Sequence, residues 1–317
     1  MRAKHPGLVR LRPGPDGASD FTLVWQDLSR LVRDLPAMPR SVRLLQHHLS
    51  HSPVDLSVVG WIIRRDPALA TQIFRLSNHF ISEDGPCITT LEECLVLLGL
   101  DCLRAQLLPN GEQWPHQQIR RLEELRRHSA LAGALSRNIA ETMGYPDPER
   151  VYFAGLLHDL GKFPPLMLSA DRLTAGSKDN PSEGAMLAHS GFVTDHCAFG
   201  AWLAAIWKLP GFLADSIEYH HDVDSAHVEP WVVKMVASGN QLTHALMGDR
   251  SSGASELDLH TILRRLLPSL SWAQATTLQG KVSQTYANWR EDQGESGDRT
   301  PGNFRLDQWF QGQEGQS

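Results

Sequence analysis

The sequence contains no run of about 18 uncharged apolar residues and no apolar segment behind its basic first residues, so neither a membrane-spanning helix nor a secretory signal peptide is expected. Cysteine is also scarce: there are 4 in 317 residues, without a CxxC pair. This scarcity excludes a disulfide scaffold and fits reduced thiols in a cytoplasmic protein. The thiols expected to serve packing, not chemistry, are those of Cys87, Cys94, Cys102 and Cys197.

Excess positive charge is absent as well. The formal net charge is −6 and the pI is near 6.2, which gives no overall attraction to nucleic acid or to an anionic membrane. The arginines between 120 and 127 alternate with Glu123 and Glu124, as is typical of a solvated helix face. The hydrophobic content of 41% is enough for a core. The sequence does not indicate an oligomeric state.

Alternating strand patterns, Gly-rich phosphate loops and internal repeats are missing, while apolar residues recur at intervals of three and four. The fold class predicted is all-α. Asp66-Pro67 predicts a helix start, Gly99 a helix stop and Ser271 a helix cap. The longer helices are expected at 67–78, 91–98, 102–108, 118–143, 149–160, 192–207, 215–221, 232–247, 256–267 and 272–289.

Proline and glycine divide the chain. The first 20 residues hold too many of them for a packed element, and the residues after Arg290 are too polar to bury a core. The domains expected are a flexible leader at 1–20, a helical domain at 21–250, C-terminal helices at 251–290 and a disordered tail at 291–317. Pro109-Asn110-Gly111 divides the helical domain into an N-terminal subdomain at 21–115 and a second subdomain at 118–250.

Histidine is abundant, with 15 residues, and the doublet His158-Asp159 closes an apolar helix. Imidazoles and a carboxylate that converge from different helices form a metal site. The candidates for such convergence are His128, His158, Asp159, His196, His220 and His221. An ion-free alternative is a buried hydrogen-bonded network of His158, Asp159 and His128, in which Gly161 only ends the helix. The histidines expected to be surface or packing residues are His47, His48, His51, His79, His116, His189, His227, His244 and His260.

The pattern of His128, then His158-Asp159 followed by Gly161-Lys162, resembles the HD superfamily of helical metal-dependent phosphohydrolases. His196, His220 and His221 resemble the extra histidines of its HD-GYP branch, which cleaves cyclic dinucleotides at a site of two or three metals. Two features depart from that branch. No Gly-Tyr-Pro follows His221, and Asn240 stands where a final metal-binding Asp is expected; an amide ligand brings no charge.

Further motifs resemble the HDOD domain, the HD-related output domain of bacterial signalling proteins. They lie at 35–39, 62–69, 73–78, 91–99, 154–161, 199–203 and 206–210, and the His220-His221 pair follows them. This resemblance covers about residues 25–250. It implies an HD-type helical fold whose metal ligands are often eroded.

Two functions follow from the resemblance, and fold alone does not decide between them. The favoured one is a non-catalytic signal-transduction module that binds a protein partner or a nucleotide second messenger. The alternative is a metal-dependent phosphohydrolase or phosphodiesterase acting on a nucleotide or cyclic dinucleotide. In it, Asp159 bridges two ions and Lys162 counters phosphate charge. The expected cofactor is a divalent Fe, Mn, Zn or Ni ion, or none if the site is eroded.

Overall fold

The computed structural model describes residue 37 and residues 39–80, 88–106, 116–163, 196–247 and 264–293. Every regular element in these ranges is helical, with no strand, and the all-α prediction is confirmed. None of the described helices is both long and apolar enough to cross a bilayer. The expected leader, the predicted helical residues 256–263 and the tail from residue 294 lie outside the described residues. The division into domains stays a prediction.

The N-terminal helices include the predicted helix at 67–78, and the two helices predicted at 91–98 and 102–108 form one kinked helix. They are α2 (Pro39–Ser50), α3 (Leu56–Arg64), α4 (Pro67–His79) and α5 (Leu91–Gln106). The Asp66 carboxylate accepts the N–H groups of Ala68 and Leu69 at 3.1 and 3.2 Å, which caps α4 at the predicted start. Gly99 has a φ of 68° and breaks α5, so the predicted stop is confirmed as a kink.

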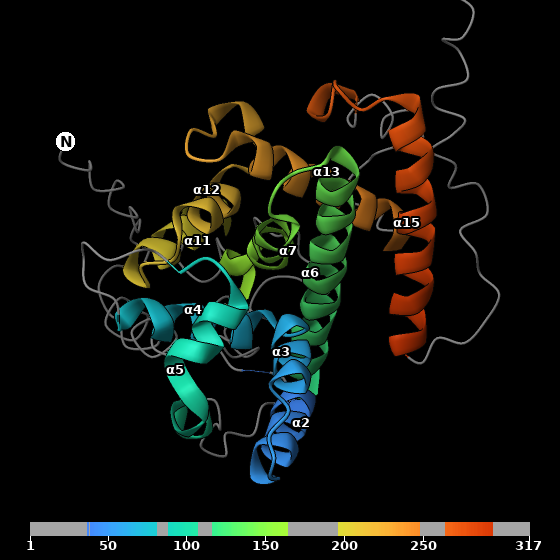
Figure 1. The fold of residues 1–317 in the computed structure, drawn as a ribbon. Coiled ribbons are helices and arrows are strands. Elements are labelled where there is room, and N and C mark those ends of the chain that lie inside the picture. The colour runs from blue at the N-terminus through green and yellow to red at the C-terminus, as the bar shows by residue number, and fades with distance from the viewer. Residues whose placement is uncertain are drawn as a thin grey trace, which may run out of the picture.

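The long helix α6 is the centre of the molecule (Figure 1). Helices α7, α13 and α15 pack against it, and α11 and α12 pack against each other. The bounds are α6 (His116–Met143), α7 (Pro148–Leu157), α11 (His196–Ile206), α12 (Gly211–Tyr219), α13 (Pro230–Met247) and α15 (Trp272–Asp292), with 3-10 turns η1 (Leu160–Lys162) and η2 (Val223–Ser225). This packing brings together the ends of α7 and α12 and the start of α11, which are far apart in the sequence.

One hydrophobic core joins the N-terminal helices to this centre. The rings of Phe74 on α4 and Phe153 on α7 lie edge to face, with centroids 5.2 Å apart. The Tyr152 hydroxyl donates to the Arg64 carbonyl oxygen at 2.6 Å. The N-terminal helices therefore hold α7 firmly just before the His158-Asp159 doublet.

Three helix boundaries near the doublet and the histidine pair differ from the predictions, and one of them is the end of α12 at Tyr219 instead of 221. Helix α7 ends at Leu157 instead of 160, so the doublet lies in the turn between α7 and η1. Helix α12 begins at Gly211, because the Pro210 carbonyl accepts the first helical N–H groups. Asp215 therefore lies inside α12, where its carboxylate accepts the N–H groups of Val228 and Glu229 and fixes the approach to α13.

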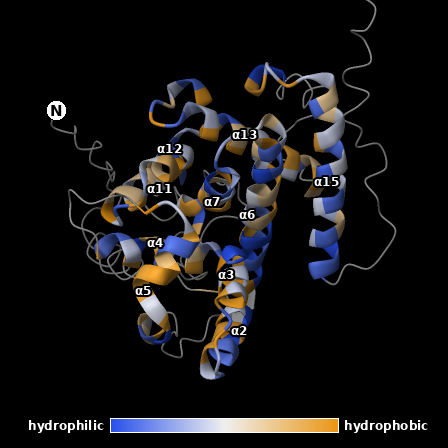
Figure 2. Cartoon of the chain, viewed as in Figure 1, coloured by the Kyte–Doolittle hydropathy of each residue, from blue (hydrophilic) through white to orange (hydrophobic). Residues whose placement is uncertain are grey.

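Helix α15 packs one narrow apolar face on α6. Ser271 and Gln274 form a capping box at its start, which confirms the predicted cap. Figure 2 shows that most of its surface is hydrophilic. The helix continues to Asp292, three residues past the predicted helix end at 289, and the Asp292 carboxylate pairs with Arg65 at 2.6 Å.

Candidate metal centre

Asp159 lies at the middle of the candidate site, with 1% of its surface exposed. Its two carboxylate oxygens face different partners. Oδ2 lies 3.3 Å from His158 Nε2, 3.5 Å from His128 Nε2 and 2.9 Å from Lys162 Nζ. Oδ1 lies 3.4 Å from His196 Nε2 and 3.6 Å from His220 Nε2. One carboxylate therefore stands between two groups of imidazoles.

The first group consists of His128, His158 and Asp159, whose ligand atoms lie within 4.8 Å of one another. His158 Nδ1 lies 2.7 Å from the Gly155 carbonyl oxygen. Because a carbonyl only accepts, Nδ1 carries the proton and Nε2 keeps a lone pair toward Asp159. A backbone contact of this kind orients a metal-binding histidine.

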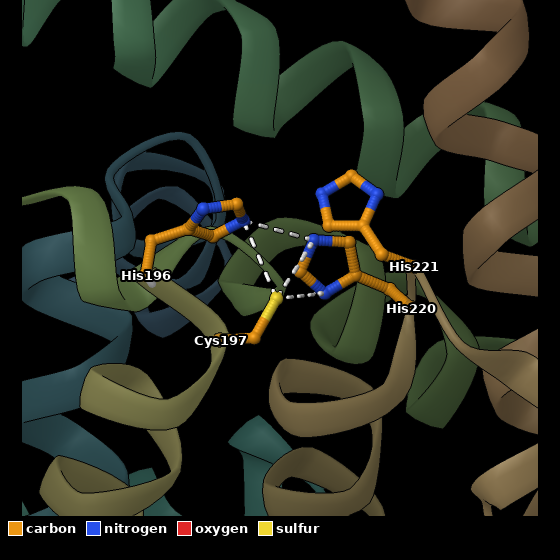
Figure 3. A group of neighbouring side chains, drawn as sticks. All are labelled: His196, Cys197, His220 and His221. Carbon is orange, nitrogen blue, oxygen red and sulfur yellow. Dashed lines mark hydrogen bonds between the residues drawn. The ribbon is translucent and has the colours of Figure 1, made fainter. Parts of the chain in front are cut away.

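The second group consists of His196, Cys197, His220 and His221, again with ligand atoms within 4.8 Å (Figure 3). His220 Nδ1 lies 3.1 Å from the carbonyl oxygens of Ser216 and Ile217, so its Nε2 keeps the lone pair. That Nε2 is 3.3 Å from His196 Nε2. The first turn of α11 and the end of α12 thus present their imidazoles to the same point.

Several buried polar atoms in this region have no hydrogen-bond partner among the described residues. They are His128 Nε2, His158 Nε2, Asp159 Oδ1 and Asn240 Oδ1. Leaving such an atom unsatisfied costs about 1 to 3 kcal/mol. The described residues alone therefore leave the hydrogen-bonded network of His158, Asp159 and His128 incomplete. Imidazole nitrogens with free lone pairs beside a carboxylate are a donor set that fits divalent metal ions.

The electrostatics agree with this fit. Burial lowers the pKa of His128 to about 3 and holds the pKa of His220 well below its usual value. Burial raises the pKa of Asp159, but its interactions with the His158 imidazole and the Lys162 ammonium group outweigh burial and hold that pKa well below its usual range. At neutral pH these groups are neutral imidazoles and an ionised carboxylate. Those are the protonation states that metal binding requires.

Gly161 brings the two groups together. A Cβ atom at this position would collide with the carbonyl oxygen of His196 and approach the Gly200 nitrogen at 2.8 Å. Only glycine lets α11 approach η1 this closely, and that approach places His196 beside Asp159. Gly161 therefore does more than end the helix, which is the role that the ion-free alternative gave it.

The sequence-based candidates separate into three sets. The structure brings His128, His158, Asp159, His196, His220 and His221 together in the two groups. Asn240 is 2% exposed on α13, the helix that packs against α6, and Lys162 contacts Asp159 directly. Two neighbours were missed. His244, expected at the surface or in packing, has its ring centroid 4.7 Å from that of His128, and Cys197 belongs to the second group.

The chain is similar to a known family over more than half its length. The family profile of the HDOD domain matches residues 35–223. An uncharacterized protein of Treponema pallidum (strain Nichols) is 24% identical over 230 residues, which is 69% of this chain and 44% of that protein. The chain therefore spans less than half the length of that relative.

Two solved structures share the fold. A fragment of the MmoQ response regulator from Methylococcus capsulatus str. Bath has a TM-score of 0.56 at 18% identity, covering 74% of this chain and 91% of the fragment. A virulence factor from Campylobacter jejuni subsp. jejuni has a TM-score of 0.54 at 18% identity, covering 87% and 90%. At these identities the likeness concerns the fold alone.

Proposed function

Because the chain belongs to the HDOD family, a branch of the HD superfamily, we propose that it has kept the metal centre of that superfamily and hydrolyses a phosphoester of a nucleotide or cyclic dinucleotide. One observation carries this proposal. The two oxygens of the buried Asp159 carboxylate each face a separate group of imidazoles, as a carboxylate shared by two divalent ions does.

The residues divide between two ion positions. His128 and His158 would hold the first with Asp159 Oδ2, and the buried amide oxygen of Asn240 would add a further ligand. His196 and His220 would hold the second with Asp159 Oδ1, and His221 lies beside them on the exposed side. The imidazole and carboxylate ligands suit divalent Fe, Mn, Zn or Ni. Bound ions of this kind polarise a phosphoryl oxygen and supply a nucleophile from water at neutral pH.

Lys162 has two tasks in this proposal. Its ammonium group lies 2.9 Å from Asp159 Oδ2 and holds that oxygen between the imidazoles. Its side chain is 18% exposed, so it stands at the edge of the buried cluster. A cation at that edge counters the charge of an incoming phosphate group.

The second candidate is the non-catalytic signalling module that the sequence favoured, with the metal kept for structure. Asn240 supports it, because an amide oxygen neutralises less charge than a carboxylate and holds a divalent ion less tightly. In this role the chain binds a protein partner or a nucleotide and carries out no reaction. A cytoplasmic location is part of both candidates.

Hydrolysis assays separate the two candidates. Protein reconstituted in turn with Fe²⁺, Mn²⁺, Zn²⁺ and Ni²⁺ is incubated with cyclic dinucleotides and nucleotides, and the products are separated by chromatography. The hydrolase predicts turnover that the His158→Ala/Asp159→Ala variant lacks. The exposed His227 provides the matched control, because His227→Ala removes an imidazole outside the two groups. Metal-loaded protein that turns over none of these substrates would favour the signalling module.

A further inference from the structure

Cys197 lies beside the imidazoles of the second group. Its Sγ atom is 3.5 Å from His196 Nε2 and 3.9 Å from His220 Nε2 (Figure 3). The residue is 8% exposed, on the first turn of α11. Figure 3 shows the thiol and the two imidazoles pointing toward one another. The sequence predicts that Cys197 is a packing residue and does not predict its place beside two imidazoles.

Apart from the longer distance of 3.9 Å between Cys197 Sγ and His220 Nε2, the spacing of these atoms is that of a metal coordination shell. Tetrahedral ligands at about 2.0 Å for nitrogen and about 2.3 Å for sulfur lie roughly 3.3 to 3.6 Å from one another. His196 Nε2 and His220 Nε2 are 3.3 Å apart, and Cys197 Sγ is 3.5 and 3.9 Å from them. Asp159 Oδ1 lies 3.4 and 3.6 Å from the same nitrogens. The two imidazole nitrogens therefore lie within 4 Å of both the thiol sulfur and the carboxylate oxygen.

The carboxylate supplies independent support for an ion at that point. Asp159 is 1% exposed, and its Oδ1 atom has no hydrogen-bond partner among the described residues although it faces this group. Lys162 donates to the other oxygen, Oδ2, and a buried carboxylate oxygen without a donor is stabilised by a bound cation. The ring centroids of His221 and His220 lie 4.2 Å apart. Because His221 is exposed, it marks the side of the second group that is open to solvent.

We propose that Cys197 is a metal ligand, and that the second position is a His196, Cys197, His220 and Asp159 site for a thiophilic divalent ion. The inference rests on the metal-binding part of the proposed function and adds the identity of the ion. A sulfur ligand favours Zn²⁺ or Fe²⁺ over the oxygen-preferring Mn²⁺ and Mg²⁺. On binding, a sulfur–metal bond forms and the thiol proton passes to solvent.

Cobalt substitution tests this ligand by spectroscopy, without reference to activity. The full chain, stripped of metal under reducing conditions, is titrated with Co²⁺, and bound cobalt is counted by elemental analysis. A sulfur–cobalt bond gives a charge-transfer band in the near ultraviolet, and nitrogen and oxygen ligands alone do not. We expect the band in the wild-type protein and its loss in Cys197→Ser. Circular dichroism of the metal-free proteins shows whether Cys197→Ser is folded.

Two further variants sharpen the result. Cys102→Ser removes a half-buried thiol on α5 and keeps the band. His128→Ala removes a ligand of the first position and also keeps the band, with one cobalt ion fewer per chain. X-ray absorption of the Zn²⁺-loaded protein adds a sulfur shell at about 2.3 Å, which Cys197→Ser lacks.

The outcomes separate this inference from the proposed function. Bound cobalt without a charge-transfer band, or with a band that Cys197→Ser retains, would overturn the role of Cys197 and leave the metal centre standing. A wild-type protein that binds no cobalt would overturn the metal centre and the thiolate ligand together.

Discussion

His196 Nε2 lies 3.4 Å from Asp159 Oδ1, and this contact joins the two halves of the candidate centre. His196 comes from the first turn of α11, and Asp159 from the turn between α7 and η1. Neither element holds a complete metal site. The chemistry therefore depends on how closely α11 approaches the doublet.

Replacing Asp159 by Asn tests the shared carboxylate. The substitution keeps the shape of the side chain and removes the charge that faces both groups. We expect metal affinity to fall at both positions, by more than the roughly 10- to 100-fold loss typical of residues that only orient a ligand. Isothermal titration calorimetry measures the metal affinity of the variant and of the wild type. Asp222→Asn, at an exposed position beside Ser225, should bind metal as the wild type does. Loss at one position only would show that Asp159 is not shared.

Replacing Gly161 by Ala tests the close approach of α11. The added methyl group meets the backbone of His196, so the structure must shift. Such overpacking costs about 1 to 3 kcal/mol in the free energy of unfolding, which urea denaturation measures. The same shift should weaken metal binding at the second position. Gly280→Ala on α15 meets open space and should be neutral or stabilising by up to about 1 kcal/mol. Equal stability of the two variants would contradict the packing at Gly161.

Replacing Asn240 by Asp restores the charge that the superfamily pattern carries at this position. A carboxylate binds a divalent ion more tightly than an amide does, so we expect the first position to gain on the order of 10-fold in affinity. Calorimetric titration of His196→Ala/Asn240→Asp against His196→Ala isolates this position. Asn288→Asp adds the same charge at an exposed place on α15 and should change nothing. Unchanged or weaker binding would show that Asn240 does not face the ion.

Tyr152 should make stability fall at alkaline pH. Burial raises the pKa of this phenol to about 12, above its ordinary value near 10. Because the folded protein holds the proton more tightly than the unfolded chain, the contribution is complete below pH 10 and is lost as pH rises toward 12. Tyr152→Phe should therefore lose less stability over this interval, by up to about 2 kcal/mol.

The Tyr152→Phe variant also lacks the hydrogen bond to the Arg64 carbonyl, which costs it about 1 kcal/mol at neutral pH. Urea unfolding at several pH values between about 8 and about 12 measures both effects. Parallel pH curves for the variant and the wild type would mean that Tyr152 is not buried in the folded protein.

Local signals in the sequence predicted the helices and their caps well. Asp66 and Ser271 cap helices because a short polar side chain reaches the free N–H groups of the first helical turn. Such a cap depends only on residues that are close in the sequence. The HDOD resemblance is confirmed, since the family profile matches most of the described core. The convergence of His196 and His220 on Asp159 followed from that resemblance, and the structure supplies its geometry.

The sequence did not predict three features that depend on contacts between segments far apart in the chain. Cys197 was interpreted as packing because a lone buried cysteine usually packs, and its proximity to His220 arises only when α11 meets α12. Gly161 looks like a helix stop until the His196 backbone lies against it. Asp215 was expected to begin α12, yet it accepts N–H groups from the segment before α13.

The most direct test of the metal centre is the metal content of the chain purified without chelator and without an affinity metal, measured by inductively coupled plasma mass spectrometry. The proposal predicts near-stoichiometric iron, manganese, zinc or nickel in the wild type and its loss in His158→Ala/Asp159→Ala. Wild-type protein that carries no metal, and takes up none after reconstitution with these ions, would contradict it.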